Sequence, residues 1–292
     1  MNATTEGTLQ VPGASLYYKV RGAGPVLLIL QGGAGDADGS EGLVECLVGA
    51  FKVVTYDRRG LSRSKLNNAG GLPGIETHSE DAHHLLAALT PEPAFVVGFS
   101  MGALIALDLV ARHPEQVRAL VAHEPGTILD LLPDAQRADA LQGHEEVEQL
   151  FRSHGVAAAM KKMVALAGVN IDDREPEVEV TPPEGASAAR MAANMAFFLS
   201  YDLPAVDRYK ADLAALGAAR ARILPAAGRS SGEIVPRRSI LALAERLGLQ
   251  VADFPGGHTG YVLRPREFAL KLRELLNAPL STQRDGLTGG RV

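Results

Sequence analysis

One serine stands between two apolar runs in FVVGFSMGALIAL, which covers residues 95–107. Gly98 and Gly102 lie two positions before and after Ser100, so that the segment matches the pattern G-x-S-x-G. This pattern is typical of a strained turn from a strand into a helix, at which the serine hydroxyl projects above the carboxyl edge of a sheet. Side chains at the two glycine positions would collide with the neighbouring strand and helix. The spacing therefore predicts that Ser100 is a nucleophile, provided that the chain supplies a base to accept its proton.

Strand-like and helix-like segments alternate along most of the chain. After a short predicted hairpin, apolar runs typical of buried strands occur at residues 25–30, 52–57, 94–99, 117–125, 221–228 and 249–254. Segments with helical spacing lie between them, at residues 41–51, 79–89, 101–114, 236–248 and 265–276. Ser79 is the predicted N-cap of the second of these helices. Strands separated by helices favour an α/β fold, with a mostly parallel central sheet and helices on both faces.

The span 126–217 interrupts this alternation, because it contains Ala-, Leu- and Met-rich helical stretches and no convincing strand. We interpret it as a helical cap, or lid, inserted between two strands of the main sheet. Residues 1–125 and 218–278 then form the core of the fold. The polar, Gly-rich tail at residues 279–292 is predicted to be disordered.

Composition excludes several classes of protein. A net charge of −5 and a pI near 5.9 argue against a nucleic-acid-binding protein, which needs a basic face. No apolar stretch approaches the ~20 residues that span a bilayer, and the N-terminus lacks the features of a signal peptide. Cys46 is the single cysteine, which excludes an internal disulfide and a cysteine-based metal site. We expect a cytoplasmic protein, and its Ala- and Arg-rich composition is typical of bacteria. The expected partner is a small-molecule substrate, and both a monomer and a homodimer are compatible with the sequence.

The motif and the order of elements together resemble the α/β-hydrolase superfamily, in its serine-nucleophile branch. The resemblance extends over about residues 8–278. Its specific parts are GFSMG at 98–102, QGG at 31–33, YDRRGLSRS at 56–64 and PGGHTGY at 255–261. It implies the α/β-hydrolase fold and a catalytic triad in the chain order serine, acid, histidine.

His258 is the predicted general base. It follows the last predicted strand, on a glycine-flanked loop at the same edge of the sheet as Ser100. His83 and His84 are adjacent and not four residues apart, and no downstream H-x-E or cysteine pair completes a metal site. The chain also lacks G-x-G-x-x-G and a P-loop lysine. We therefore expect neither a metal nor a cofactor.

The acid is where the sequence departs from the superfamily pattern. The commonest arrangement implies an aspartate after the strand at residues 221–228, but none stands in that loop. Glu233 lies further along the same loop, and Glu124 ends the strand that directly follows the elbow helix. We favour Glu124, because a position at the end of a strand holds an imidazole more rigidly than a Gly-Ser loop. Asp253 is disfavoured because it lies within the last predicted strand.

Two backbone amides are predicted to bind the oxyanion. The first belongs to Met101, immediately after the nucleophile, and the second comes from the glycine loop that begins at Gln31. Matching this loop to the superfamily's His-Gly-x pattern makes Gly33 the second donor, with Gly32 as the alternative. Gln31 replaces the usual histidine, and its amide can still brace the loop.

The predicted lid supplies apolar side chains in the segment MAANMAFFLSYDLPAV, residues 191–206. We name Met191, Met195, Phe198 and Tyr201 as candidate substrate-binding residues, because flexible methionines with aromatics suit an apolar acyl or ring system. Such a stripe more often forms the packed interior of a lid than the wall of a pocket.

Three classes of function are compatible with these residues. The favoured class is a serine hydrolase, carboxylesterase- or lactonase-like, which cleaves an ester, thioester or lactone of a small to medium apolar substrate through an acyl-enzyme. The second is a non-hydrolytic enzyme on the same fold, such as a cofactor-free haloperoxidase, a perhydrolase-like enzyme or a lyase. The third is a non-catalytic binding protein. Ser100 disfavours the opening of haloalkanes and epoxides, for which the superfamily uses a carboxylate nucleophile.

Overall fold

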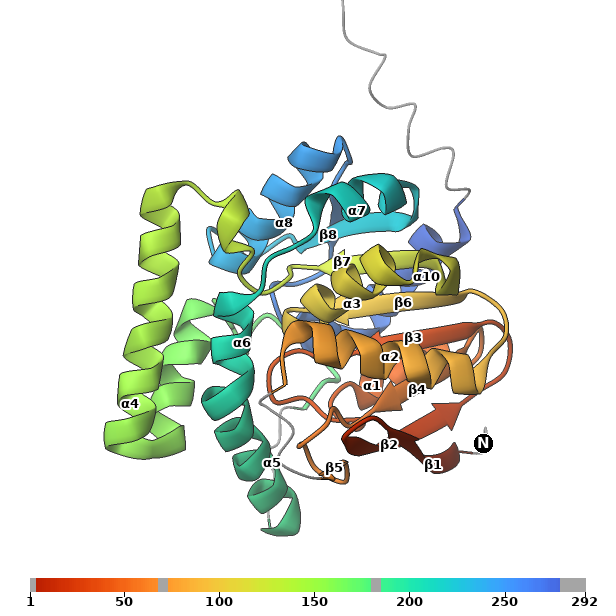
Figure 1. Cartoon of the computed structure of the whole chain (residues 1–292), viewed down its shortest axis with the longest axis horizontal. Helices are drawn as coiled ribbons and strands as arrows, with labels where there is room; N and C mark the ends of the chain where they lie inside the picture. The colour runs from red at the N-terminus through yellow and green to blue at the C-terminus, as the bar shows by residue number, and fades with distance from the viewer. Residues whose placement is uncertain (1–3, 68–72, 180–184, 279–292) are drawn as a thin grey trace, which may run out of the picture.

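A computed structural model describes residues 4–67, 73–179 and 185–278 (Figure 1). Within these residues the strands form one sheet in the order β1-β2-β4-β3-β6-β7-β8-β9, and β5 pairs with β2. Strands β1 and β2 form the predicted hairpin, and β2 also pairs antiparallel with β4. All pairs from β4 onward along this order are parallel. The strands are β1 (Thr4–Val11), β2 (Ala14–Arg21), β3 (Val26–Leu30), β4 (Lys52–Tyr56), β5 (Lys65–Leu66), β6 (Ala94–Phe99), β7 (Val117–His123), β8 (Ile223–Gly228) and β9 (Ala252–Phe254).

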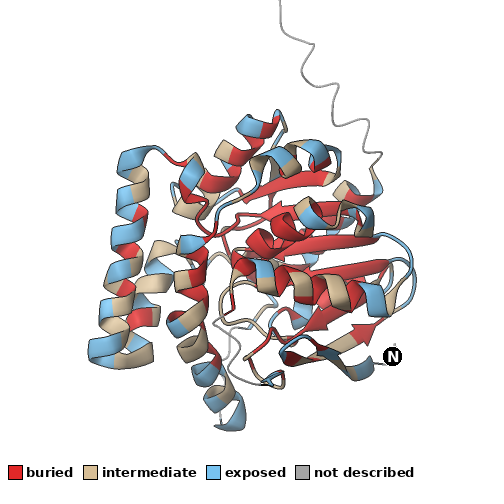
Figure 2. Ribbon diagram, in the orientation of Figure 1, coloured by how far each residue is buried: buried red, intermediate tan, exposed pale blue. Residues whose placement is uncertain are grey.

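Helices cover both faces of this sheet, which confirms the predicted fold class (Figure 1). One face packs against α1 (Glu41–Leu47) and α10 (Pro265–Asn277). The other packs against α2 (Ile75–Leu89), α3 (Met101–Arg112), α7 (Leu213–Ala219) and α8 (Val235–Leu247). Side chains of a strand alternate between the two faces, so Leu28 and Leu30 of β3 pack under α3 while Leu27 and Ile29 pack under α1. The central strands β3, β4, β6, β7 and β8 and helix α3 are accordingly the most buried parts of the fold (Figure 2).

Helix α2 begins four residues before the predicted position. Its first residue is Ile75 and its N-cap is Gly74, so the prediction that Ser79 caps this helix is wrong. Ile75 and Ser79 are both completely buried on one face of the helix, together with His78. Because the side chains at 78 and 79 are polar although they are buried, they interrupt the apolar 3.6-residue pattern that predicts a helix. Ile75 packs in the core one turn earlier, so the helix begins there.

The chain between β7 and β8 forms α4 (Asp134–Leu166), α5 (Gly185–Phe197), the π-helical turn η3 (Phe198–Asp202) and α6 (Leu203–Arg208), followed by α7. Residues 134–166 and 185–208 lie together at one end of the sheet, and we call them the cap (Figure 1). Helix α4 kinks at Gly155, where φ is +79°. The tail that was predicted to be disordered lies outside the described residues.

The remaining short elements are the 3-10 turns η1 (Pro114–Gln116), η2 (Leu129–Leu131) and η4 (Arg220–Arg222), and the helix α9 (Gly260–Leu263). Among the described helices, none combines the length and the apolar character needed to cross a membrane.

Candidate active site

Ser100 forms the junction between β6 and α3. Its backbone has φ +52° and ψ −120°, a conformation that residues other than glycine rarely adopt. Both flanking glycines are required by close contacts, as the sequence predicted. A Cβ on Gly98 would overlap the Gly102 carbonyl oxygen, and a Cβ on Gly102 would overlap the Leu30 carbonyl oxygen. The turn is therefore a strained elbow with Ser100 at its tip.

Glu124 is the first residue after β7, and its backbone is also strained, with φ +43°. The completely buried carboxylate accepts two hydrogen bonds at 2.8 Å, one from the backbone N–H of Gly228 and one from Nδ1 of His258. Because a carboxylate accepts hydrogen bonds, Nδ1 of a neutral His258 holds the proton and Nε2 has the free lone pair. The structure thus joins Glu124 to His258, and both His258 and Ser100 line one cavity.

The electrostatic setting keeps Glu124 ionised. Burial alone would raise the pKa of its carboxyl group, but the hydrogen bond from His258 and the neighbouring imidazoles of His123 and His258 lower that pKa to about 2. A carboxylate in this state can orient the imidazole and stabilise its protonated form.

The alternative acid lies elsewhere. The Glu233 side chain is 78% exposed, and its carboxylate lies 3.8 Å from Arg237 and 3.6 Å from Arg238. Glu233 lines the cavity, where the loop before α8 forms part of the wall. Its position is that of a rim residue paired with arginines, rather than a partner of His258.

The glycine loop lies beside Ser100. A Cβ on Gly32 would lie 3.1 Å from the Ser100 Cβ, whereas a Cβ on Gly33 would meet nothing within 4 Å. Gln31 braces the loop as expected, because its amide donates to the Ser40 hydroxyl at 2.6 Å. Met101 begins α3, and the first amides of a helix lack intrahelical acceptors and lie at the positive end of its dipole.

A buried ion pair joins this loop to the cap. Arg58 donates to the carbonyl oxygens of Gln31 and Gly33 and to the carboxylate of Asp202, the last at 3.0 Å. His78 Nε2 lies 3.2 Å from the other Asp202 oxygen. Burial raises the pKa of the Asp202 carboxyl, but Arg58 and His78 outweigh this effect and hold it below its usual range. The sequence analysis includes Arg58 only in the segment YDRRGLSRS and gives no signal for its pairing with Asp202.

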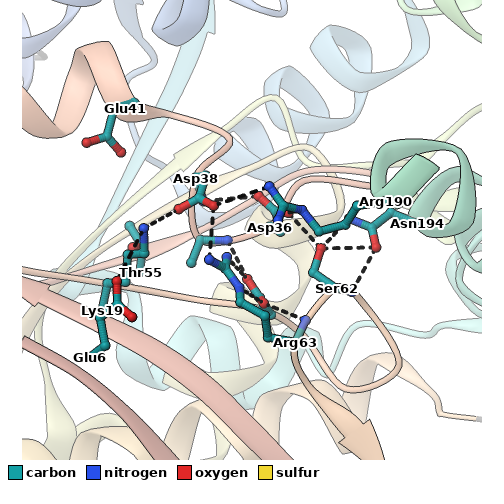
Figure 3. A network of polar contacts seen from close by, with 12 residues as sticks. Glu6, Lys19, Asp36, Asp38, Glu41, Thr55, Ser62, Arg63, Arg190 and Asn194 are labelled. Atoms are coloured by element: carbon teal, nitrogen blue, oxygen red, sulfur yellow. Dashed lines mark hydrogen bonds and ion pairs between the residues drawn. The ribbon is translucent and has the colours of Figure 1, made fainter. Parts of the chain in front are cut away.

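A second polar network joins α5 to the end of the same loop (Figure 3). The Ser62 hydroxyl donates to Asp36 at 2.6 Å, and its backbone N–H donates to the Asn194 side chain at 2.8 Å. Asn194 also donates to the Ala34 carbonyl at 3.3 Å, and Arg190 lies 3.5 Å from Asp36. The cap is therefore fixed to the core on the side that contains the glycine loop.

The cavity above Ser100 has a volume of about 340 Å³ and extends into the cap. Of the four predicted substrate-binding residues, Phe198 lines it. Among the described residues, Met191, Met195 and Tyr201 are not part of its wall, and Met191 is 41% exposed. Met191 of α5 precedes Phe198 of η3 by seven residues, which is about two helical turns, so its exposure follows from its position earlier along the helix and not from the helix face on which it lies. Apolar wall residues that the sequence analysis missed are Met163, Leu166, Leu203, Val206 and Ile234.

Another histidine lies directly before Glu124. His123 is completely buried against the rings of Phe99, Phe254 and Phe268, and within the described structure neither ring nitrogen has a hydrogen-bond partner. Burial lowers the pKa of His123 to about 4, so the ring is neutral at pH 7.

One cluster among the described residues has the composition of a metal site. Ligand atoms of Glu80, His83 and His113 lie within 4.8 Å of one another. The His83 and His113 rings stack at 3.8 Å, and the His83 Nδ1 lies 2.9 Å from the Gln116 side-chain oxygen. None of these residues lines the cavity at Ser100.

Comparison with known proteins adds four findings. Residues 25–184 match the family model of the alpha/beta hydrolase fold. The chain is 40% identical over 274 residues to the uncharacterized hydrolase YraK of Bacillus subtilis, covering 92% of this chain and 95% of that protein. It is 27% identical to the zearalenone hydrolase of Bionectria ochroleuca, covering 91% and 95% of the two chains. A thermophilic esterase from Thermogutta terrifontis superposes with a TM-score of 0.71 at 20% identity, covering 94% and 98%.

The His123 environment predicts an acid-sensitive stability. The unfolded chain binds a proton at this imidazole near pH 6.5, while the folded chain binds it near pH 4. Stability is therefore lost as the pH falls from 6.5 to 4, by ~3 kcal/mol at most. We expect that His123→Phe, which keeps an aromatic ring in the cluster, removes this contribution to the pH dependence. Urea unfolding at pH 7, 5 and 4 measures the free energy of unfolding of both proteins. An unchanged difference between pH 7 and pH 4 would contradict the assigned burial of a neutral ring.

The Arg58–Asp202 pair predicts a large effect of a small substitution. Asp202→Asn leaves the buried Arg58 without its counterion, and we expect the free energy of unfolding to fall by about 3–5 kcal/mol. Asp134→Asn makes the same chemical change at a 99% exposed cap residue and should alter stability by less than about 0.5 kcal/mol. Urea unfolding measures both variants, and equal effects would show that Arg58 does not depend on Asp202.

Proposed function

Because the chain belongs to the alpha/beta hydrolase fold family, we propose that this hydrolase uses Ser100 to cleave an ester, thioester or lactone of a small to medium apolar substrate through an acyl-enzyme. The main support is the Glu124–His258 hydrogen bond of 2.8 Å beside the cavity that also contains Ser100. A buried acid, an oriented imidazole and a strained serine at one edge of a sheet form the constellation that activates a serine hydroxyl.

In the proposed reaction, the Ser100 hydroxyl attacks the substrate carbonyl while His258 Nε2 accepts its proton. The negative charge that develops on the carbonyl oxygen is bound by the Met101 amide and by the amide of Gly33 or Gly32. His258 then returns the proton to the leaving group, which departs and leaves an acyl group on Ser100. Water, deprotonated by His258, attacks the acyl-enzyme. The bond to Ser100 then breaks, His258 returns the proton to the Ser100 oxygen, and the acid is released. Glu124 remains ionised throughout and stabilises the imidazolium.

The cavity supports an apolar substrate. Most of its wall comes from aliphatic and aromatic side chains of the cap and of the loop before α8. Its volume of about 340 Å³ lies at the lower end of the range for small-molecule sites. The relative that is named a zearalenone hydrolase and the structural neighbour described as an esterase are compatible with this choice of substrate class.

The first test concerns the nucleophile. Ser100→Ala should abolish turnover of a panel of 4-nitrophenyl esters and labelling by a fluorophosphonate probe, because both need the same hydroxyl. Thermal unfolding should change little, since alanine keeps the backbone of the elbow. Turnover that survives in Ser100→Ala would remove Ser100 from the mechanism. Labelling of the wild-type protein without turnover of any ester in the panel would favour a non-hydrolytic reaction.

The second test compares the two candidate acids. Glu124→Gln should lower kcat by about 10³–10⁴-fold, because an amide can no longer hold the required tautomer or stabilise the imidazolium. Glu233→Gln makes the same change at the cavity rim and should keep kcat within about threefold, since a surface ion pair contributes little. Steady-state kinetics at pH 8 decide between them. A large loss of kcat in Glu233→Gln, with kcat retained in Glu124→Gln, would instead assign the role of the acid to Glu233.

A further inference from the structure

The cap places a second histidine–carboxylate pair at the wall of the cavity. His144 of α4 lines the cavity together with Ser100 and His258. Its Nδ1 lies 2.6 Å from a carboxylate oxygen of Asp207 on α6. Both side chains are largely shielded from bulk solvent, with exposed fractions of 15% and 23%. The short contact with Asp207 restrains the orientation of the His144 ring at the cavity wall.

The Asp207 contact determines what His144 offers to a ligand. A carboxylate accepts hydrogen bonds, so Nδ1 of the neutral ring donates its proton to Asp207. The other ring nitrogen, Nε2, is then an acceptor. The cap residues around it in the wall are mostly apolar, including Met163, Leu166, Leu203 and Val206. A polar acceptor in such surroundings gains from a hydrogen-bond donor on whatever fills the cavity.

We propose that His144, oriented by Asp207, is a substrate-recognition residue whose Nε2 accepts a hydrogen bond from a hydroxyl group remote from the scissile bond. This inference rests on the proposed function. The substrate class is then narrower than an apolar ester or lactone. One end presents the reacting carbonyl to Ser100, an apolar body fills the cavity, and the far end has an alcohol or phenol that reaches the cap.

The test uses pairs of substrates that differ by one hydroxyl. The pairs are 4-nitrophenyl ω-hydroxyalkanoates and the matching 4-nitrophenyl alkanoates, with acyl chains of six to eight carbons, which are too long to cyclise readily to a lactone. All assays are run at pH 8. For each chain length, the ratio of kcat/KM for the hydroxylated ester to kcat/KM for the plain ester reports the contribution of the hydroxyl.

We expect this ratio to peak at one chain length and to fall about five- to tenfold at that length in His144→Phe, the range for loss of one hydrogen bond. His144→Gln retains a side-chain acceptor and should recover part of the preference. His154→Phe removes an exposed histidine from the same helix and should leave the ratio as in the wild type. If His144 served only to join α4 to α6, its loss would affect both esters equally and leave the ratio unchanged.

Equal ratios in the wild type and in His144→Phe at every chain length would overturn the recognition role. That outcome leaves the proposed function intact as long as Ser100→Ala abolishes turnover of the plain esters. Turnover that persists in Ser100→Ala would instead refute the proposed function itself.

Discussion

A buried carboxylate at the end of β7 holds the candidate site together. Glu124 accepts a hydrogen bond from Gly228 at the end of β8 and another from the loop residue His258. An ionised carboxyl group in a protein interior costs several kcal/mol unless such partners are in place. The two strand ends and the histidine loop must therefore keep their relative positions for the fold to be stable. The same parallel register, with Phe99 opposite His123, sets the strained residues Ser100 and Glu124 side by side.

The cap and the glycine loop depend on a second set of buried charges. Arg58 holds two carbonyl groups of the loop and pairs with Asp202 of the cap, while Ser62 and Asn194 join α5 to the loop's far end. Because these bonds link the cap to the loop beside Ser100, a shift of the cap would also move the amides proposed to bind the oxyanion. The position of the cap is in this way coupled to the geometry at Ser100.

Local signals in the sequence predicted much of the core and of the site. The junction at Ser100 was found because a buried strand, a turn with glycines at fixed positions and a helix leave a continuous pattern. Glu124 was favoured as the acid because it stands at the end of a predicted strand. The start of α2 was missed because buried polar residues at His78 and Ser79 mask its period. The pairs Arg58–Asp202 and His144–Asp207 join residues 144 and 63 positions apart, and only the packing of the cap brings them together.

The state of His258 tests the account most directly. The ¹⁵N chemical shifts of the two ring nitrogens distinguish a protonated from an unprotonated nitrogen, and the His258→Gln variant assigns the signals. At a pH high enough to leave the ring neutral, the Glu124 hydrogen bond predicts a proton on Nδ1 and a free lone pair on Nε2, the form that can accept the serine proton. A ring protonated on Nε2 instead would contradict the role given to Glu124 and, with it, the proposed mechanism.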